Sequence, residues 1–200
     1  MAADGGGSPR SAGTRRLFSW PGYRLSSPSP IFVKFASMVT VTEATADEIP
    51  LIRDLAKRIW PDAFGKILSA AQIAYMLDWM YSPESLSEQM SRGHRFLLAS
   101  AGEDFAGYCS YQVTRKSAVA KLHKIYVLPS AHGEGVGAAL LTEVIRRVRQ
   151  EHVSRLRLNV NRQNRAVGFY EKFGFKIVDT EDNDIGRGYF MNDYVMEVAV

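Results

Sequence analysis

The feature that most restricts the fold of this chain is the run His132–Gly137, in which glycine occupies positions 133, 135 and 137. The run follows an alternating apolar stretch and opens a segment of helical periodicity, whose apolar positions are Val136, Leu140, Leu141, Val144, Ile145 and Val148. Glycine allows positive φ angles and close approach to a ligand, and the first turn of a helix presents unpaired amides that favour an anion. This order predicts an α/β fold that binds a pyrophosphate at the start of the helix.

Two common pyrophosphate sites do not fit this loop. A P-loop ends in Gly-Lys-Ser or Gly-Lys-Thr, and neither sequence follows the glycines. Gly133, Gly135 and Ala138 match the dinucleotide pattern G-x-G-x-x-A, but that site also needs a carboxylate at the end of the next strand to hold a ribose. The next predicted strand ends in Asn-Val-Asn at 159–161. A nucleoside triphosphate and a dinucleotide are therefore both disfavoured.

The remaining patterns predict one domain over residues 39–200. Thr45 and Glu48 have the spacing of a capping box, which begins a helix, and Ser82 with Pro83 begins another. Helices are expected after the capping box through Ile59 and over 69–80, 83–92, 136–148 and 166–173, and strands over 39–43, 95–101, 104–116, 119–128, 156–160, 175–178 and 189–198. This order predicts an α/β fold with a mixed, mostly antiparallel sheet of six to seven strands flanked by helices.

Residues 1–38 form a basic N-terminal tail that we expect to be disordered. The tail is rich in Gly, Ser and Pro and holds five basic residues and one acidic residue. It lacks the apolar core of a secretory signal, and its Arg/Ser-rich composition weakly resembles a transit peptide. A third interpretation, which we prefer, is that Met38 is the natural start, because a strand pattern begins at Val39.

Charge and cysteine content exclude several classes of partner. The sequence pI is about 9.2, but the tail accounts for the net charge of +4 and leaves twenty basic and twenty acidic residues in the domain. A balanced domain does not predict nucleic-acid binding, and no apolar run reaches the ~20 residues that span a bilayer. Cys109 is the single cysteine, which favours a buried thiol and a cytoplasmic location. We expect no metal, and a homodimer is one option for assembly.

Two further runs of sequence carry a resemblance to a known family. The run at 122–137, LHKIYVLPSAHGEGVG, resembles motif A of the GNAT acetyltransferase superfamily, and the run at 159–175, NVNRQNRAVGFYEKFGF, resembles motif B. The resemblance covers residues 39–200, and it implies a GNAT-like single domain that uses acetyl-CoA as cosubstrate. His132 departs from the pattern, because the family usually carries Arg or Gln at this position.

The resemblance implies direct transfer of an acetyl group from the thioester to an amine. The backbone of Ile125, Tyr126 and Val127 would pair with pantetheine, and the Val127 N–H would polarise the thioester carbonyl. Tyr170 would contact the cosubstrate and donate a proton to the departing thiolate. The other cosubstrate-binding positions that it implies are His132, Gly133, Gly135, Val136, Gly137, Ala138 and Asn164.

His123 is a candidate for the base that deprotonates the amine. It aligns with a position where many family members carry Glu, and an imidazole with an ordinary pKa of ~6.5 can accept a proton at pH 7. The alternative is a core histidine, since strand alternation places His123 on one face with Ile125 and Val127. A catalytic role predicts that His123→Gln lowers kcat/KM and flattens its pH dependence.

The acceptor is less defined by the sequence. Aromatic residues mixed with carboxylates lie between the first two strands, and Trp60, Phe64, Tyr75 and Trp79 are the candidates to contact an amine. The overall pattern is loosely similar to bacterial polyamine-type acetyltransferases, which makes a polyamine one candidate. Protein N-termini, protein lysines, amino acids and aminoglycosides remain alternatives. A non-catalytic acyl-CoA-binding sensor with the same fold, or a nucleic-acid-binding protein acting through the tail, are functions of other classes.

Overall fold

The computed structural model describes residues 39–113 and 118–200. The predictions for the tail at 1–38 and for the strand end at 114–116 lie outside the described residues. The described part contains β1 (Val39–Ala44), α1 (Ile49–Phe64), α2 (Ala70–Tyr81), α3 (Pro83–Ser91), β2 (Arg95–Ala101), β3 (Asp104–Val113), β4 (Val119–Val127), α4 (Val136–Gln150), β5 (Arg155–Asn161), α5 (Ala166–Lys172), β6 (Lys176–Asp184) and β7 (Phe190–Ala199).

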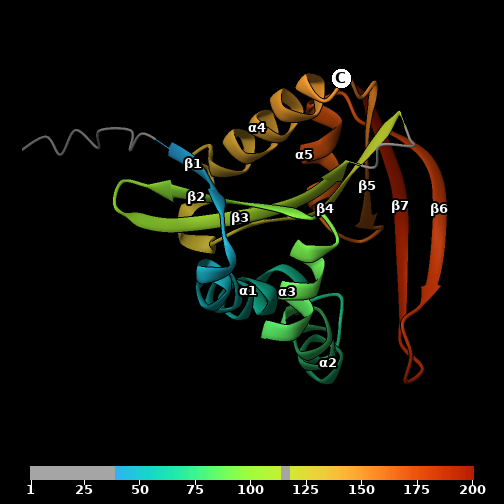
Figure 1. Ribbon diagram of the computed structural model, residues 1–200. Coiled ribbons are helices and arrows are strands. Elements are labelled where there is room, and N and C mark those ends of the chain that lie inside the picture. Colours follow the sequence, from blue (N-terminus) through green and yellow to red (C-terminus); the bar gives the residue numbers. More distant parts are fainter. Residues whose placement is uncertain (1–38, 114–117) are drawn as a thin grey trace, which may run out of the picture. The chain divides into compact units, whose positions relative to one another are not determined.

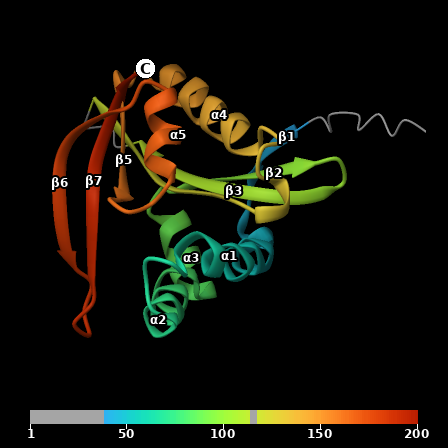
Figure 2. The ribbon, with the colours of Figure 1, turned by 180° about the vertical axis from the view of Figure 1, so that it is seen from behind.

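The strands form one seven-stranded sheet in the order β1-β2-β3-β4-β5-β7-β6. Every neighbouring pair is antiparallel except β4 and β5, which run parallel. The predicted mixed sheet of six to seven strands is confirmed. Helices α1, α2 and α3 lie on one face of the sheet, and α4 and α5 lie on the other (Figures 1 and 2).

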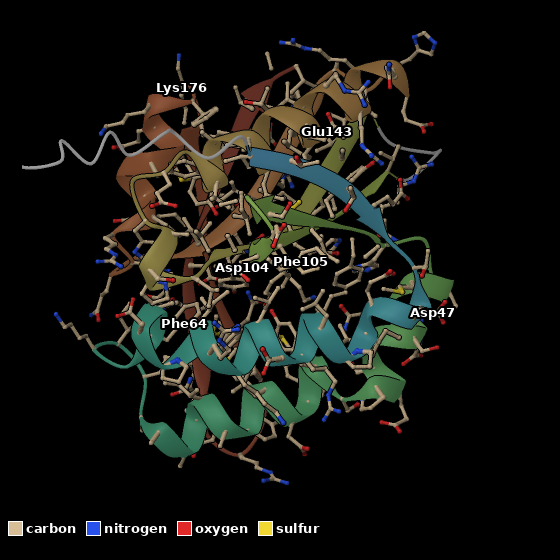
Figure 3. All side chains as sticks on the ribbon, turned by 90° about the vertical axis from the view of Figure 1, so that its left-hand side faces the viewer. Asp47, Phe64, Asp104, Phe105, Glu143 and Lys176 are labelled. Atoms are coloured by element: carbon tan, nitrogen blue, oxygen red, sulfur yellow. The ribbon has the colours of Figure 1, made fainter. Side chains whose placement is uncertain are left out.

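Each face of the sheet has its own hydrophobic core. The α4 stripe from Val136 to Val148 packs with β2–β5, α5 and β7, and the inner side of α1 packs with α2, α3 and the other face of β2 and β3. The capping box is formed, since the Thr45 backbone N–H donates to Glu48 Oε2 at 2.7 Å. In Figure 3, α1 lies between Asp47, just before its start, and Phe64 at its end, while Glu143 marks α4 on the other face.

The parallel pairing of β4 and β5 is short, and the two strands separate after it. Their register runs from Val119 opposite Arg155 only as far as Leu122 opposite Leu158. A β-bulge follows in β4, because Leu122 pairs with Tyr111 of β3 while Lys124 pairs with Ser110, which leaves one additional residue in β4. The rest of β4 therefore has an edge toward β5 that belongs to no ladder of the described sheet.

One strand is longer than the apolar pattern indicated. The expected strand 175–178 is β6, which continues to Asp184 and pairs with β7 as far as Phe190. The extension was missed because β6 is an exposed edge strand, on which polar side chains such as Asp179 and Asp182 erase the alternation that a buried face imposes.

Candidate active site

The open edge of β4 presents backbone groups at Val127. The Leu128 N–H donates to the Ala106 carbonyl of β3 at 2.8 Å. Successive peptide groups of a strand point to opposite sides, so the Val127 N–H points away from β3 and toward the gap beside β5. Gly107 permits this close approach of β3, because a Cβ there would lie 2.6 Å from the carbonyl oxygen of Tyr126. The gap thus offers an exposed amide donor beside the glycine-rich loop.

The glycine-rich loop has the conformation that its sequence predicts. Gly133 and Gly135 have φ angles of +82° and +84°, and a Cβ added at either would meet no atom within 4 Å. The first hydrogen bond of α4 joins the Ala139 amide to the Gly135 carbonyl at 2.9 Å. The amides of residues 136–138 therefore have no acceptor within the helix. An anion can approach them through the space that glycine leaves.

His132 takes part in a chain of contacts that joins four elements. Its Nε2 lies 3.1 Å from the Val127 carbonyl oxygen, and its Nδ1 lies 3.3 Å from Nη2 of Arg165. A carbonyl accepts and a guanidinium donates, so both contacts are satisfied by the neutral tautomer with its proton on Nε2. Arg165 also lies 3.4 Å from Asp62 at the end of α1. The positive charge beside the loop thus comes from Arg165, which sequence reasoning missed although it follows Asn164 directly.

Asn164 lies at the start of α5. Its Oδ1 accepts the Ala166 backbone N–H at 2.9 Å, which is a helix-capping contact. That contact uses the carbonyl oxygen of the side chain, and the Nδ2 group can still act as a donor. The side chain can therefore cap α5 and hydrogen-bond a ligand carbonyl at the same time.

Tyr170 is held in the core on the α4 side of the sheet. It is 6% exposed, and its ring packs edge-on against Phe169 at 5.3 Å and Phe175 at 5.7 Å. Burial raises the pKa of Tyr170, and the nearby ionisable groups of Tyr126 and Cys109 raise it further. Its hydroxyl therefore stays protonated at neutral pH. Cys109 is fully buried, as its place in the strand predicted.

His123 faces the opposite way from the expected direction. The bulge in β4 interrupts the alternation, so Ile125 and Val127 pack with the α4 core while the ring of His123 stacks on His94 at 4.1 Å, before β2. The pKa of His123 is lowered to about 3, mainly by burial and also by the charges of His94 and Lys124. The prediction that His123 shares a face with Ile125 and Val127 is therefore wrong. The imidazole is neutral at pH 7 but weakly basic, and its role as the base remains a prediction.

Lys124 is a buried amine that sequence reasoning missed. Its Nζ donates to Gln89 Oε1 at 2.6 Å and lies over the rings of Tyr81 and Phe96 at 5.6 and 5.7 Å. Burial lowers its pKa to about 8. The bulge explains why it was missed. Uninterrupted alternation would have placed Lys124 and His123 on opposite faces of the sheet, whereas the bulge places both on the same face.

Asp193 is a buried carboxyl group on β7. It is 5% exposed, and its Oδ1 has no hydrogen-bond partner among the described residues. Its pKa is raised to about 6, mainly by burial and also by the charge of Glu181 on β6, while Lys121 and Arg162 act in the opposite direction. A carboxyl group with this pKa exchanges a proton close to neutral pH.

The four aromatic residues proposed to contact the acceptor lie in two environments. Trp60 and Phe64 are buried, at 1% and 5% exposure, because they continue the inner side of α1. Tyr75 and Trp79 stack on each other at 6.1 Å on α2, and Trp79 is 51% exposed. Tyr75 also donates its hydroxyl to the Ile185 carbonyl in the β6–β7 turn at 2.8 Å. An acceptor that comes from solvent can therefore reach the Tyr75–Trp79 pair but not the buried Trp60 and Phe64.

The described residues contain neither a candidate metal-binding cluster nor a candidate membrane-spanning helix. No cluster of three or more His, Cys, Asp or Glu side chains within 39–113 and 118–200 could hold a metal ion. None of the helices in that part of the chain is both long enough and apolar enough to span a membrane.

Comparison with known proteins points to acetyl transfer. The family model described as "Acetyltransferase (GNAT) domain" matches residues 67–197. An uncharacterized N-acetyltransferase of Mycobacterium tuberculosis is 32% identical over 153 residues, covering 76% of this chain and 95% of that protein. The spermidine N(1)-acetyltransferase of Thermoplasma acidophilum is 26% identical over 153 residues, covering 73% and 93%.

A solved structure supports the same fold. The chain is similar to the PaiA N-acetyltransferase of Thermoplasma acidophilum in complex with coenzyme A, with a TM-score of 0.69 and 24% sequence identity. The match covers 82% of this chain and 99% of that one. The likeness extends over nearly the whole of the described domain.

Proposed function

Since the chain belongs to the GNAT acetyltransferase family, we propose that it transfers the acetyl group of acetyl-CoA directly to a primary amine. The observation that carries this proposal is the open edge of β4, which places the Val127 amide beside the glycine-rich loop and the core that holds Tyr170. An amide donor, an anion site and a protonated phenol are the groups that acyl transfer from a CoA thioester requires.

The described residues suit acetyl-CoA at this edge. The amides from Gly133 to Ala138 would hold the pyrophosphate, and the guanidinium of Arg165, which contacts His132, would add positive charge beside the loop. The backbone of Ile125 and Val127 would pair with pantetheine. The Val127 carbonyl already contacts His132, which leaves the Val127 N–H for the thioester carbonyl, where it would stabilise developing negative charge.

Tyr170 would donate the proton that the departing thiolate needs. Its pKa is raised, so the phenol keeps its proton until a thiolate forms next to it. The acceptor nitrogen attacks the carbonyl carbon, the carbon–sulfur bond breaks, and the sulfur takes the Tyr170 proton. The phenolate then recovers a proton from the nitrogen, which is more acidic once it is acylated.

For the acceptor we propose a small-molecule amine, with spermidine as the first compound to test and a protein amine as the alternative. The named activity of the Thermoplasma relative supports this choice. Tyr75 and Trp79 offer an exposed aromatic surface for a cation, although Arg187 already lies 4.8 Å over the Tyr75 ring and would have to move for a ligand to use that face.

The test is release of CoA from acetyl-CoA with a panel of polyamines, amino acids, aminoglycosides and N-terminal peptides. We expect turnover with at least one amine, and we expect Tyr170→Phe to lower kcat by about 100-fold or more while the Kd for acetyl-CoA stays the same. Tight acetyl-CoA binding without turnover of any amine, with Tyr170→Phe indistinguishable from wild type, would identify an acyl-CoA sensor instead.

A further inference from the structure

Asp193 lies level with the reacting end of β4. Asn161, its partner on β5, is three residues beyond Leu158, where the β4–β5 pairing ends. On β4, three residues beyond Leu122 plus the one additional residue of the bulge lead to Tyr126. Asp193 is therefore level with the peptide group that joins Tyr126 to Val127, with β5 between β7 and the gap.

The side chain of Asp193 also faces the side of the sheet from which an acceptor would come. Met191, two residues earlier on β7, packs with the α1–α3 core, and alternate residues of a strand share a face. Tyr126 belongs to that core as well. The charge of Asp193 is one cause of the raised pKa of Tyr126, which places the two groups within electrostatic reach.

Asp193 differs from the carboxylates around it. Glu197, on the same face of β7, pairs with Arg155 and Arg157, and Glu181 accepts from Asn159 at 2.8 Å. These groups are committed to protein partners. Asp193 instead has a buried oxygen that no described residue hydrogen-bonds, and an unsatisfied buried carboxylate oxygen is costly unless a ligand uses it.

We propose that Asp193 is the general base that takes the proton from the acceptor ammonium group, which deepens the acetyl-transfer function proposed above and rests on it. One N–H bond of the ammonium breaks and the proton passes to Asp193 Oδ1. The freed lone pair then attacks the thioester carbonyl carbon, and Asp193 later releases the proton to solvent. The proton that reaches sulfur through Tyr170 is a second one from the same nitrogen, so the amide keeps a single hydrogen.

Burial is the largest cause of the raised pKa of Asp193. Among the charged groups, Glu181 and Asp182 raise it, while Lys121 and Arg162 lower it. Asp193 in turn contributes to the raised pKa of Tyr126. With a pKa of about 6, Asp193 is ionised at pH 7 but still basic enough to accept a proton. The buried His123, with a pKa of about 3, is a weaker base.

The test compares Asp193→Asn with Glu181→Gln across pH 5 to 9, using the best amine of the panel. For wild type, the plot of log kcat/KM against pH should change slope near pH 6. Below this break kcat/KM should fall as the pH decreases. Asp193→Asn should lower kcat at least about 100-fold and lose the break. Glu181→Gln keeps the base but removes a charge that raises its pKa, so the break should move to lower pH. His123→Gln should retain the break.

An Asp193→Asn enzyme that keeps the break and loses less than tenfold in kcat would overturn the proposal while leaving acetyl transfer intact. Absence of turnover in wild type with every amine would instead refute the proposed function. A measurement that needs neither turnover nor a variant is the ¹³C NMR titration of the Asp193 carboxyl in the full-length protein. A midpoint near 6 supports the assignment, and a midpoint below about 4.5 would also overturn it.

Discussion

At the scale of single residues, burial and hydrogen bonding shift the pKa values of two carboxyl groups in opposite directions. Asp193 has its pKa raised to about 6 mainly by burial. Glu143 on α4 has its pKa lowered to about 2, mainly by a hydrogen bond from Arg146 and also by one from Arg147. A group that binds its proton more tightly in the folded state destabilises the fold once that proton is lost, and a group that binds it less tightly does the opposite.

The stability of Asp193→Asn relative to wild type should therefore rise with pH. Between about pH 4 and 6 the unfolded chain releases the Asp193 proton while the folded chain retains it, so wild type loses stability over this window and the variant does not. We expect a relative gain on the order of 1 kcal/mol at pH 7 after allowing for solvent screening. Urea unfolding at pH 4, 5, 6 and 7 measures it.

Glu143→Gln is the matched control with the opposite sign. The stability from Glu143 is present above its unfolded pKa and is lost as pH falls through about 2. Its variant should be less stable than wild type at pH 7, and the deficit should shrink below about pH 4.5. If the stability differences of the two variants from wild type changed with pH in the same way, the opposite pKa shifts assigned to Asp193 and Glu143 would be contradicted.

At the scale of elements, the start of α4 is a loop whose glycines serve both the backbone and the ligand. Gly135 has a φ of +84°, which costs a residue with a Cβ about 1–2 kcal/mol. The space in front of it is open, and in our proposal the pyrophosphate fills that space. The same glycine thus permits the turn and leaves room for the anion.

Gly135→Ala should raise the Kd for acetyl-CoA by tenfold or more and lower the Tm by a few degrees. Gly102→Ala is the matched control, because Gly102 also has a positive φ, +70°, and open space at its Cβ, but it lies in the turn between β2 and β3. It should lower the Tm similarly without changing the Kd. Calorimetric titration of both variants with acetyl-CoA measures the difference, and equal Kd values for the two would contradict the phosphate role of the loop.

At the scale of the whole molecule, charge is unevenly divided along the chain. Residues 1–38 carry the whole net charge of +4, whereas residues 39–113 and 118–200 contain a seven-stranded sheet and two hydrophobic cores. We propose that the domain at 39–200 folds and binds acetyl-CoA by itself, and that the tail supplies only charge.

A chain that begins at Met38 should therefore melt within a degree or two of the full-length protein and bind acetyl-CoA with the same Kd. It should also lose retention on a cation exchanger, since its charge is balanced. A drop of more than about 5 °C in the Tm, followed by circular dichroism, would mean that residues before Met38 contribute to the folded domain.

Local patterns were sufficient to predict the order of the elements and the positive φ angles of the glycine-rich loop. A helix stripe, a capping box and three alternating glycines depend on neighbours a few residues apart, so the sequence contains their full physical cause. Tyr170 and Asn164 were identified through the family resemblance, which one short segment carries, and their roles remain predictions. The prediction made edge strand β6 too short because nearly all of its side chains are exposed.

The sequence by itself determined the α/β class and the glycine-rich loop. Only the tertiary structure decided which way the candidate base groups face and how strongly they hold protons. The bulge in β4 turns His123 and Lys124 to the same side, and the pairing of β7 with β5 brings Asp193 level with Tyr126. The physical reason is that strand register and burial arise from contacts between distant segments. A shift of one residue changes the face of a side chain, and burial sets its pKa.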